Sequence, residues 1–371
     1  MVDAAPLRKK SYTQLRPGLT LGILGGGQLG RMLAQAAADF GLQSHIYAPE
    51  ADSPAFELGA AYTCAPYSDR YSLQNFAETV DAVTFEFENV PTATLDRLAK
   101  ARSGLKIFPP AKALAITQDR IAEKSFMRDL GLKTAPFAAV DGLDSLELAL
   151  AEISAPAILK TRRMGYDGKG QARVGSAKDA AAAYEEIGGQ SAILEGFVSF
   201  TREISVIAAR GQDGAVVSYE ACENAHRNHI LSRTTLPAAI TPKTAERARE
   251  AAELIIASLD YVGVLAVEMF VIGTGAGEDV VMNEIAPRVH NSGHWTIEGA
   301  TTSQFEQHVR AVMGLPLGST ARRGLIEMDN LLGEDMHRVT GLLETEGAHL
   351  HLYGKKQARK GRKMGHVTFV R

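Results

Sequence analysis

The chain has 371 residues, which is long for one hydrophobic core and predicts two or three domains. The net charge of −3 gives no reason to expect nucleic acid or an anionic membrane as a partner. With 45% hydrophobic and 22% charged residues, the composition is typical of a soluble globular protein. No apolar run approaches the roughly 20 residues that a membrane span needs. We expect residues 1–18, which lack the apolar core of a secretion signal, to be a disordered extension.

The two cysteines, Cys64 and Cys222, lie far apart and outside any metal-ligand spacing. Their number predicts reduced, incidental thiols in a cytoplasmic protein.

Strand and helix signals alternate over the first third of the chain. An apolar run at 19–24 precedes a glycine turn and a helical pattern that ends at Gly41, as a glycine after a helix does. The alternation continues to about residue 115. It predicts parallel βαβ units in an open sheet and an N-terminal Rossmann-like domain over 19–116.

The glycine turn fits a dinucleotide fingerprint. Gly25, Gly27 and Gly30 have the G-x-G-x-x-G spacing between a strand and a helix, and Glu50 lies near the position of a ribose-binding acid. The glycines by themselves require only a tight turn and close helix–sheet packing. Another anion or a polar substrate could use the same helix N-terminus, so both interpretations stay open here.

A second glycine-rich loop follows in the middle of the chain. After a helix at roughly 118–130, a strand at 157–163 carries Lys160 and leads into a loop over 165–171 that contains Lys169. Three glycines in six positions let backbone N–H groups approach an anion closely. The alternative is a solvated hairpin tip, although a simple hairpin needs fewer glycines.

The next segment ends a buried strand at Glu195, which could face a nucleobase or be an ordinary surface acid. The tract 222–233 is rich in polar residues: Glu223, His226, Arg227, His229 and Arg233. It lacks the paired His/Cys spacing of a zinc site, so we predict polar loop residues lining a site. A helix is expected from about 245 to 259.

Two apolar alternating runs then flank the glycine-rich tract 273–279. If they form a hairpin folded near Ala276, Glu268 and Glu284 face each other with Cβ atoms about 5 Å apart. Two carboxylates at that distance repel each other unless a cation lies between them. Oxygen ligands at this spacing suit Mg²⁺ that also binds substrate phosphates.

A helix near 303–313 and the sequence Gly314-Leu-Pro-Leu-Gly318 precede the last part of the chain. This part contains a basic tract over 355–363. The tract could be a solvated turn, a site for one phosphate, or a nucleic-acid contact. The lack of interleaved aromatic residues and the slightly acidic chain argue against nucleic acid.

Several strings together resemble one family. A lysine-bearing strand, a glycine-rich loop, a Glu-Gly-Phe-Val strand end and a hairpin with two acids follow the βαβ units, as in the ATP-grasp superfamily. GGGQLGRM, TQDR, GYDGKGQ, NEIAPRVHNSGHW, SQFEQH and GRKMGH resemble the N5-carboxyaminoimidazole ribonucleotide synthases of purine biosynthesis. The resemblance covers about residues 19–371. NEIAPRVHNSGHW discriminates best, because other ATP-grasp enzymes share the metal acids but not the run after them.

The resemblance implies an α/β (α+β) fold with an N-terminal open parallel βαβ domain, a central ATP-grasp domain and a small C-terminal β domain. The ATP-grasp domain would span 117–315 and carry a mobile glycine-rich lid, and the C-terminal domain would span 316–371. The implied activity is that of a carbon–nitrogen ligase, which carboxylates 5-aminoimidazole ribonucleotide with ATP and bicarbonate. A homodimer is implied as well.

The resemblance also assigns site residues. Mg²⁺ would be bound by Glu268 and Glu284. ATP would be bound by Arg120, Lys160, Gly165, Tyr166, Asp167, Gly168, Lys169, Gly170, Gln171, Glu195, Gly196, Phe197, Val198, Glu203, His226, Asn283 and Glu284. Bicarbonate and the carboxyphosphate made from it would be held by Arg288, His290, Asn291 and Ser292. The aminoimidazole ribonucleotide would contact Gln28, Tyr166, Asp167, Lys355, Arg362 and Lys363.

Three rival functions remain. The first is another ATP-grasp ligase, such as a formate-dependent glycinamide ribonucleotide transformylase or a biotin carboxylase. The second is an NAD-dependent oxidoreductase, which leaves the paired acids and the second glycine loop unexplained. The third is an inactive binding protein, which would not need both acids together with Arg288 and Lys160.

Overall fold

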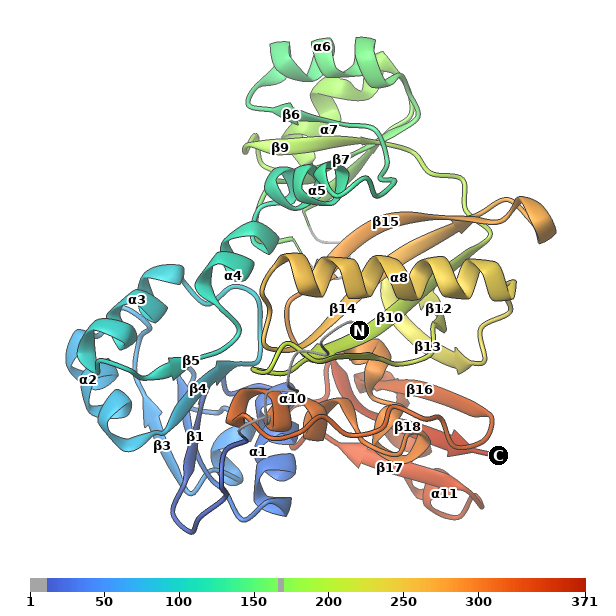
Figure 1. The fold of residues 1–371 in the computed structure, drawn as a ribbon. Coiled ribbons are helices and arrows are strands. Elements are labelled where there is room, and N and C mark those ends of the chain that lie inside the picture. Colours follow the sequence, from blue (N-terminus) through green and yellow to red (C-terminus); the bar gives the residue numbers. More distant parts are fainter. Residues whose placement is uncertain (1–11, 166–169) are drawn as a thin grey trace, which may run out of the picture.

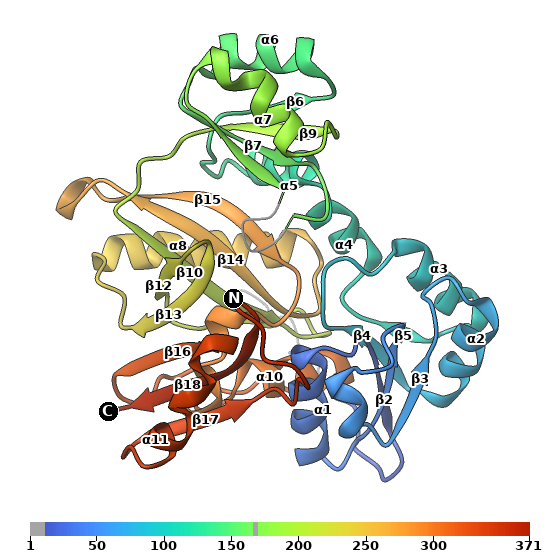
Figure 2. The same cartoon turned by 180° about the vertical axis from the view of Figure 1, so that it is seen from behind.

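The computed structural model describes residues 12–165 and 170–371. It confirms the predicted α/β class: helices pack on a parallel sheet and on antiparallel sheets (Figures 1 and 2). Of the expected extension 1–18, residues 1–11 lie outside the described residues. The rest contacts the folded chain, because the Thr13 amide donates to the Gly314 carbonyl at 2.9 Å. Within the described ranges, no helix combines the length and apolarity needed to cross a bilayer.

The N-terminal part forms a parallel sheet in the order β3-β2-β1-β4-β5 (Figure 1). Its strands are β1 (Thr20–Leu24), β2 (Gln43–Ala48), β3 (Ala61–Cys64), β4 (Ala82–Phe85) and β5 (Lys106–Ile107), with helices α1 (Gln28–Asp39), α2 (Arg70–Thr79) and α3 (Thr92–Ala101). Leu21, Ile23 and Leu24 of the central strand β1 are all fully buried, as expected where helices cover both faces of a parallel sheet.

Two helices lead out of this unit, α4 (Ala111–Thr117) and α5 (Arg120–Asp129). The helix predicted over about 118–130 corresponds to α5, whereas the sequence did not predict α4. Asp119 separates them, because its carboxylate caps α5 by accepting the N–H groups of Ile121 and Ala122 at 3.1 and 3.3 Å. With only seven residues, α4 is too short to give a clear helical period.

A small antiparallel sheet lies at the top of Figure 1, in the order β6-β9-β7-β8. Its strands are β6 (Phe137–Val140), β7 (Ala157–Thr161), β8 (Gln171–Val174) and β9 (Ala192–Gly196), and it is accompanied by α6 (Leu143–Ile153) and α7 (Ala180–Glu186). Lys160 of β7 and Glu195 of β9 therefore belong to the same sheet.

The large antiparallel sheet has the order β15-β14-β10-β12-β13-β16-β18-β17, with β11 beside β10. Its strands are β10 (Arg202–Arg210), β11 (Val216–Ser218), β12 (Cys222–Arg227), β13 (Ile230–Leu236), β14 (Gly263–Ile272), β15 (Asp279–Ala286), β16 (Ile326–Leu332), β17 (Ala348–Leu352) and β18 (Lys363–Val370). The helices of this part are α8 (Pro242–Ser258), α9 (Thr296–Gly299), α10 (Gln304–Met313) and α11 (Val339–Leu343). Helix α8 covers the face formed by β10, β14 and β15.

The C-terminal strands β16, β17 and β18 extend this large sheet. Strand β13 pairs with β16 through Arg233 opposite Asp329 and Leu236 opposite Ile326. Among the described residues, the expected C-terminal unit 316–371 thus continues the sheet of the preceding segment and has none of its own. The basic tract at 355–363 connects β17 to β18, and residues of this tract line the same cavity as the paired acids.

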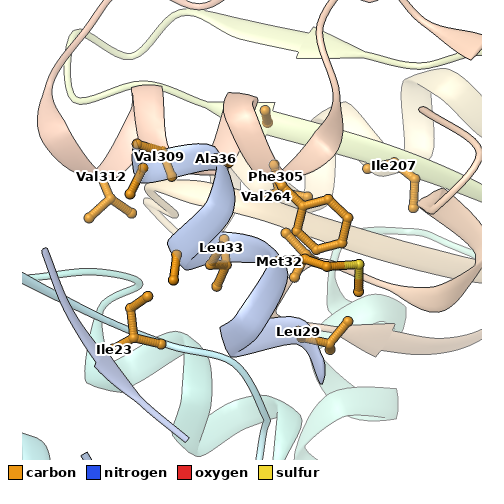
Figure 3. Packing of buried hydrophobic residues seen from close by; sticks show 14 of the residues in the cluster. Ile23, Leu29, Met32, Leu33, Ala36, Ile207, Val264, Phe305, Val309 and Val312 are labelled. Atoms are coloured by element: carbon orange, nitrogen blue, oxygen red, sulfur yellow. The ribbon is translucent and has the colours of Figure 1, made fainter. Parts of the chain in front are cut away.

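One apolar cluster also joins the N-terminal unit to the large sheet (Figure 3). Met32 and Leu33 of α1 pack with Phe305 and Val309 of α10, and Val264 of β14 lies in the same cluster. Complete burial of a side chain such as Leu33 contributes about 2 kcal/mol. The parallel sheet is therefore fixed against α10.

Candidate active site

The two acids of the predicted hairpin face each other. Strands β14 and β15 pair antiparallel with Glu268 opposite Glu284, which confirms the predicted register. Burial first, and then the charge of Glu284, raises the pKa of Glu268 to about 8. A third acid, Glu123 of α5, accepts the Ile285 N–H at 2.7 Å, and burial and Glu284 raise its pKa to about 8 as well. Because the ionised forms of these carboxylates are disfavoured, a cation beside them would stabilise them.

These residues fit Mg²⁺ better than a transition metal. Across residues 12–165 and 170–371, no group of three or more His, Cys, Asp or Glu side chains is arranged to hold a metal ion. Mg²⁺ does not need such a cage, since it usually takes one or two carboxylates and completes its shell with water and phosphate oxygens. Glu268 and Glu284 would supply the carboxylates.

His290 connects the acids to the segment after β15. Its Nδ1 accepts the Ser292 N–H at 3.3 Å, so the ring proton lies on Nε2 and is directed at Glu268 Oε1, 3.2 Å away. Burial and the nearby charge of Arg288 lower the pKa of His290 well below its ordinary value. The imidazole is therefore a neutral donor to Glu268.

Glu195 is an ion-paired acid in the interior. Its carboxylate lies 3.2 Å from the Lys160 ammonium and 3.2 Å from the Lys124 ammonium. Burial opposes its ionisation, but these charges and that of Arg120 outweigh it and hold the pKa of Glu195 at about 2. The alternative of an ordinary surface acid is therefore wrong. Arg120 continues the charged array to Glu284, at 3.3 Å.

The tract 222–233 forms strands where the sequence predicts a polar loop. Strands β12 and β13 are joined by a turn at Asn228 and His229, which both adopt positive φ. Cys222 and Asn224 are buried, so the alternation needed for strands is present but is masked by the polarity of Asn224. His226 lies 3.2 Å from Glu203 of β10; burial lowers its pKa, but Glu203 outweighs this and raises it overall.

An internal carboxylate occupies the N-terminal glycine turn. Glu86, which follows β4, accepts the N–H groups of Gly27 and Gly30, the latter at 2.8 Å. A Cβ on Gly25, whose φ is +111°, would lie 2.3 Å from Glu86 Cγ, so this contact explains the glycine. The pyrophosphate of a dinucleotide would need the same amides. The turn therefore gives the oxidoreductase alternative no support.

One cavity of about 1590 Å³ collects most of the predicted residues. Those that line it are Gln28, Arg120, Lys160, Gly165, Gln171, Glu195, Gly196, Phe197, Val198, Glu203, His226, Glu268, Asn283, Glu284, Arg288, His290, Asn291, Lys355, Arg362 and Lys363. They come from the two antiparallel sheets, from helices α1 and α5, and from loops between these elements. Residues that are distant in sequence thus share one site.

A few predicted residues are not brought to this cavity. Ser292 is fully buried and does not line the cavity, and its hydroxyl accepts a hydrogen bond from Ser205 at 2.6 Å. Gly170 is exposed and its carbonyl accepts the Thr161 N–H at 2.7 Å. The predictions for Tyr166, Asp167, Gly168 and Lys169, which include the lid, lie outside the described residues.

The sequence interpretation missed several acids and one lysine of the site: Glu86, Glu88, Glu123 and Lys124. Glu86 and Glu88 follow a buried strand of the parallel sheet, and the carboxyl end of such a strand is a common position for site residues. The position of Glu86 and Glu88 after this strand could therefore have identified them from the sequence. Lys124, by contrast, is a lysine in a helix whose burial follows only from the tertiary fold.

Family models match nearly the whole chain. A ribonucleotide synthetase preATP-grasp domain matches 19–118, an ATP-grasp domain 125–305, and a phosphoribosylaminoimidazole carboxylase C-terminal domain 327–371. The chain is 50% identical over 361 residues to the N5-carboxyaminoimidazole ribonucleotide synthase of Brucella melitensis, covering 97% of this chain and 98% of that one.

Solved structures of similar proteins agree. The ADP complex of an N5-carboxyaminoimidazole ribonucleotide synthetase matches with a TM-score of 0.91 at 39% identity, over 96% of this chain and 93% of that one. The Aspergillus clavatus enzyme in complex with ADP and 5-aminoimidazole ribonucleotide matches with a TM-score of 0.88 at 31% identity, over 95% and 94%. The chain therefore belongs to the N5-carboxyaminoimidazole ribonucleotide synthases, a family of ATP-grasp ligases.

Proposed function

We propose that the chain carboxylates the exocyclic amine of 5-aminoimidazole ribonucleotide with bicarbonate in purine biosynthesis, at the expense of ATP. In the first step a bicarbonate oxygen attacks the γ-phosphorus of ATP, giving carboxyphosphate and ADP. In the second step the amine attacks the carboxyl carbon, phosphate leaves, and the amine loses a proton. The products are N5-carboxyaminoimidazole ribonucleotide, ADP and phosphate.

The observation that carries this proposal is the placement of Arg288 and His290 beside Glu268 and Glu284 in one cavity. Phosphoryl transfer needs charge neutralisation and positioning more than covalent chemistry. When bound between the two acids, Mg²⁺ would neutralise the phosphates. Arg288 has a planar guanidinium suited to the oxygens of bicarbonate, and His290 and Asn291 line the wall beside it.

The rest of the cavity divides between the two large substrates. Arg120 and Lys160 are proposed to bind the ATP phosphates and the end of β9, from Glu195 to Val198, the adenine. Glu203 would bind the ribose, next to His226. At the other end, Lys355, Arg362 and Lys363 are proposed to bind the phosphate of the aminoimidazole ribonucleotide, with Gln28 beside it.

Coupled detection of ADP tests this function. We expect rapid ADP release only when bicarbonate and 5-aminoimidazole ribonucleotide are both present in degassed buffer with Mg²⁺. Formate with glycinamide ribonucleotide and bicarbonate with biotin are the matched rival pairs. ADP release that either rival pair supports, and that the proposed pair does not, would overturn the assignment.

We also propose that the chain acts as a cytoplasmic homodimer, which rests on the family resemblance. Size-exclusion chromatography with light scattering measures the oligomeric state directly. A mass of one chain, about 39.8 kDa, at micromolar concentration would refute the dimer.

A further inference from the structure

A buried glutamine holds the segment that follows β15. Gln304, the first residue of α10, is fully buried. Its Oε1 accepts the His290 N–H at 2.9 Å, and its Nε2 donates to the His290 carbonyl at 2.7 Å and to His294 Nδ1 at 3.1 Å. The carboxamide thus binds both backbone polar groups of one residue and uses both of its N–H bonds.

The orientation of this carboxamide is fixed by its partners. The His290 N–H can only donate and the His290 carbonyl can only accept, so Oε1 and Nε2 cannot be exchanged. The loop after β15 also packs directly against the Gln304 carboxamide, because a Cβ on Gly293 would lie 2.6 Å from Gln304 Oε1. A side chain of different shape or polarity at 304 would displace this loop.

The contact of Gln304 with the backbone reaches the cavity directly through His290. The His290 ring lines the cavity and points Nε2 at Glu268, 3.2 Å away, whereas Gln304 is not part of the cavity wall. Helix α10 is a rigid support for the clamp, since Phe305, Val309 and Val312 pack in the cluster with α1 (Figure 3). A site residue held from a rigid element keeps its direction better than one on a free loop.

We propose that Gln304 is a positioning residue for bicarbonate activation, which fixes the His290 backbone and thereby the direction of its imidazole in the cavity. The inference rests on the proposed function, because it assigns to His290 a contact with bicarbonate. It concerns a residue that touches no reacting atom.

The same helix offers a matched control one turn further on. Gln307 is also fully buried, and it also clamps one residue at both backbone groups: Nε2 donates to the Gly318 carbonyl at 2.8 Å, and Oε1 accepts the Gly318 N–H at 2.7 Å. Gly318 does not line the cavity. Gln304→Met and Gln307→Met therefore remove equivalent backbone clamps, only one of which leads to the site.

The experiment measures kcat and KM for bicarbonate and for ATP in wild type, Gln304→Met and Gln307→Met, with thermal unfolding of each. Both variants are expected to lose some stability, since each leaves a partly buried backbone N–H and a partly buried carbonyl without their side-chain partner. Only Gln304→Met is expected to lower kcat/KM for bicarbonate, by about 10- to 100-fold, with the KM for ATP changed by less than about twofold. Gln304→Glu keeps the acceptor for the His290 N–H and loses the donor to the His290 carbonyl. It should also lower kcat/KM for bicarbonate and leave the KM for ATP nearly unchanged.

Three results would overturn the inference: an unchanged bicarbonate kcat/KM in folded Gln304→Met, an equal loss in Gln307→Met, or unfolding of both Gln304 variants while Gln307→Met folds. The last result would make Gln304 a purely structural residue. Failure of the proposed function has a different signature, since wild type itself would then release ADP without any dependence on bicarbonate.

Discussion

Arg288 and Glu88 form an ion pair between the segment after β15 and the end of the N-terminal parallel sheet. Arg288 Nη2 lies 3.1 Å from Glu88 Oε1, and its Nε donates to the other carboxylate oxygen. Burial by itself raises the pKa of Glu88, but Arg288 outweighs this effect and the pKa is lowered overall. The Arg288 guanidinium, which is proposed to bind bicarbonate, is thus oriented by Glu88 of the N-terminal domain.

Glu88→Gln should therefore weaken bicarbonate binding. A neutral amide holds the guanidinium less firmly, and Arg288 can turn towards the other acids of the site, Glu86 and Glu284. We expect the KM for bicarbonate to rise about tenfold, with a change below about twofold for ATP, in steady-state assays of ADP release. Glu57→Gln is the control, because Glu57 pairs with Arg31 at 2.8 Å in the same unit and neither residue lines the cavity. Equal increases in both KM values would refute the orienting role of Glu88.

Two contacts of the site illustrate what the sequence could and could not predict. The register of Glu268 and Glu284 could be predicted because it depends on a local symmetry, two runs of alternating residues about one turn. The contact of Glu88 with Arg288 joins residues 200 positions apart, and no local pattern encodes it. Strings that resemble a family identified Arg288, but physical reasoning from spacing alone could not.

The fold shows a similar division. The βαβ units were predictable because apolar strands and capped helices alternate over the first third of the chain. The errors at α4 and at 222–233 arise where the pattern is too short or where a buried polar residue, Asn224, breaks the alternation. Asn224 is buried because its amide donates to Ser205 Oγ at 2.9 Å and its carbonyl accepts from Thr234 at 3.0 Å, partners that only the folded sheet supplies.

Glu284→Gln should abolish ATP turnover and leave the fold intact. The substitution removes one of the two carboxylates proposed for Mg²⁺. Relief of its repulsion with Glu268 and Glu123 offsets the loss of its ion pair with Arg120, so the unfolding temperature should change little. We expect kcat for ADP release to decrease by at least about 100-fold at saturating Mg²⁺. Asp279→Asn, at the far end of the same strand, pairs with Lys133 outside the cavity and is the control. Normal turnover in Glu284→Gln would refute the metal assignment.

Lys355→Ala should raise the KM for the aminoimidazole ribonucleotide more than the KM for ATP. Lys355 lines the cavity, and its ammonium donates to the Lys363 carbonyl at 2.8 Å, which keeps it with the other basic residues of the tract. Loss of one cation at a phosphate site should cost about 10-fold in KM. The neighbouring Lys356→Ala is the control, since Lys356 is exposed and outside the cavity wall. A similar increase in KM for both substrates would refute the assignment of Lys355 to the ribonucleotide phosphate.

Glu195 links stability to the ATP end of the site. Its carboxylate lies between the ammonium groups of Lys124 and Lys160, and the three side chains are largely withdrawn from water. The pKa of Glu195 falls from its ordinary value of 4.5 to about 2, despite the burial that acts in the other direction. A carboxyl with a lowered pKa in the folded state stabilises that state above the unfolded value and loses this contribution as the pH falls through the folded value.

Glu195→Gln should accordingly destabilise the chain, by about 3–5 kcal/mol, because it leaves two buried ammonium groups without their counter-charge. The stability difference from wild type should be complete above pH 4.5 and shrink as the pH falls towards about 2, where Glu195 of the wild type becomes protonated. Urea unfolding of both proteins across this range measures the difference. Glu147→Gln, at an exposed position on α6, should change stability by less than about 0.5 kcal/mol. A pH-independent difference would contradict the ionised triad.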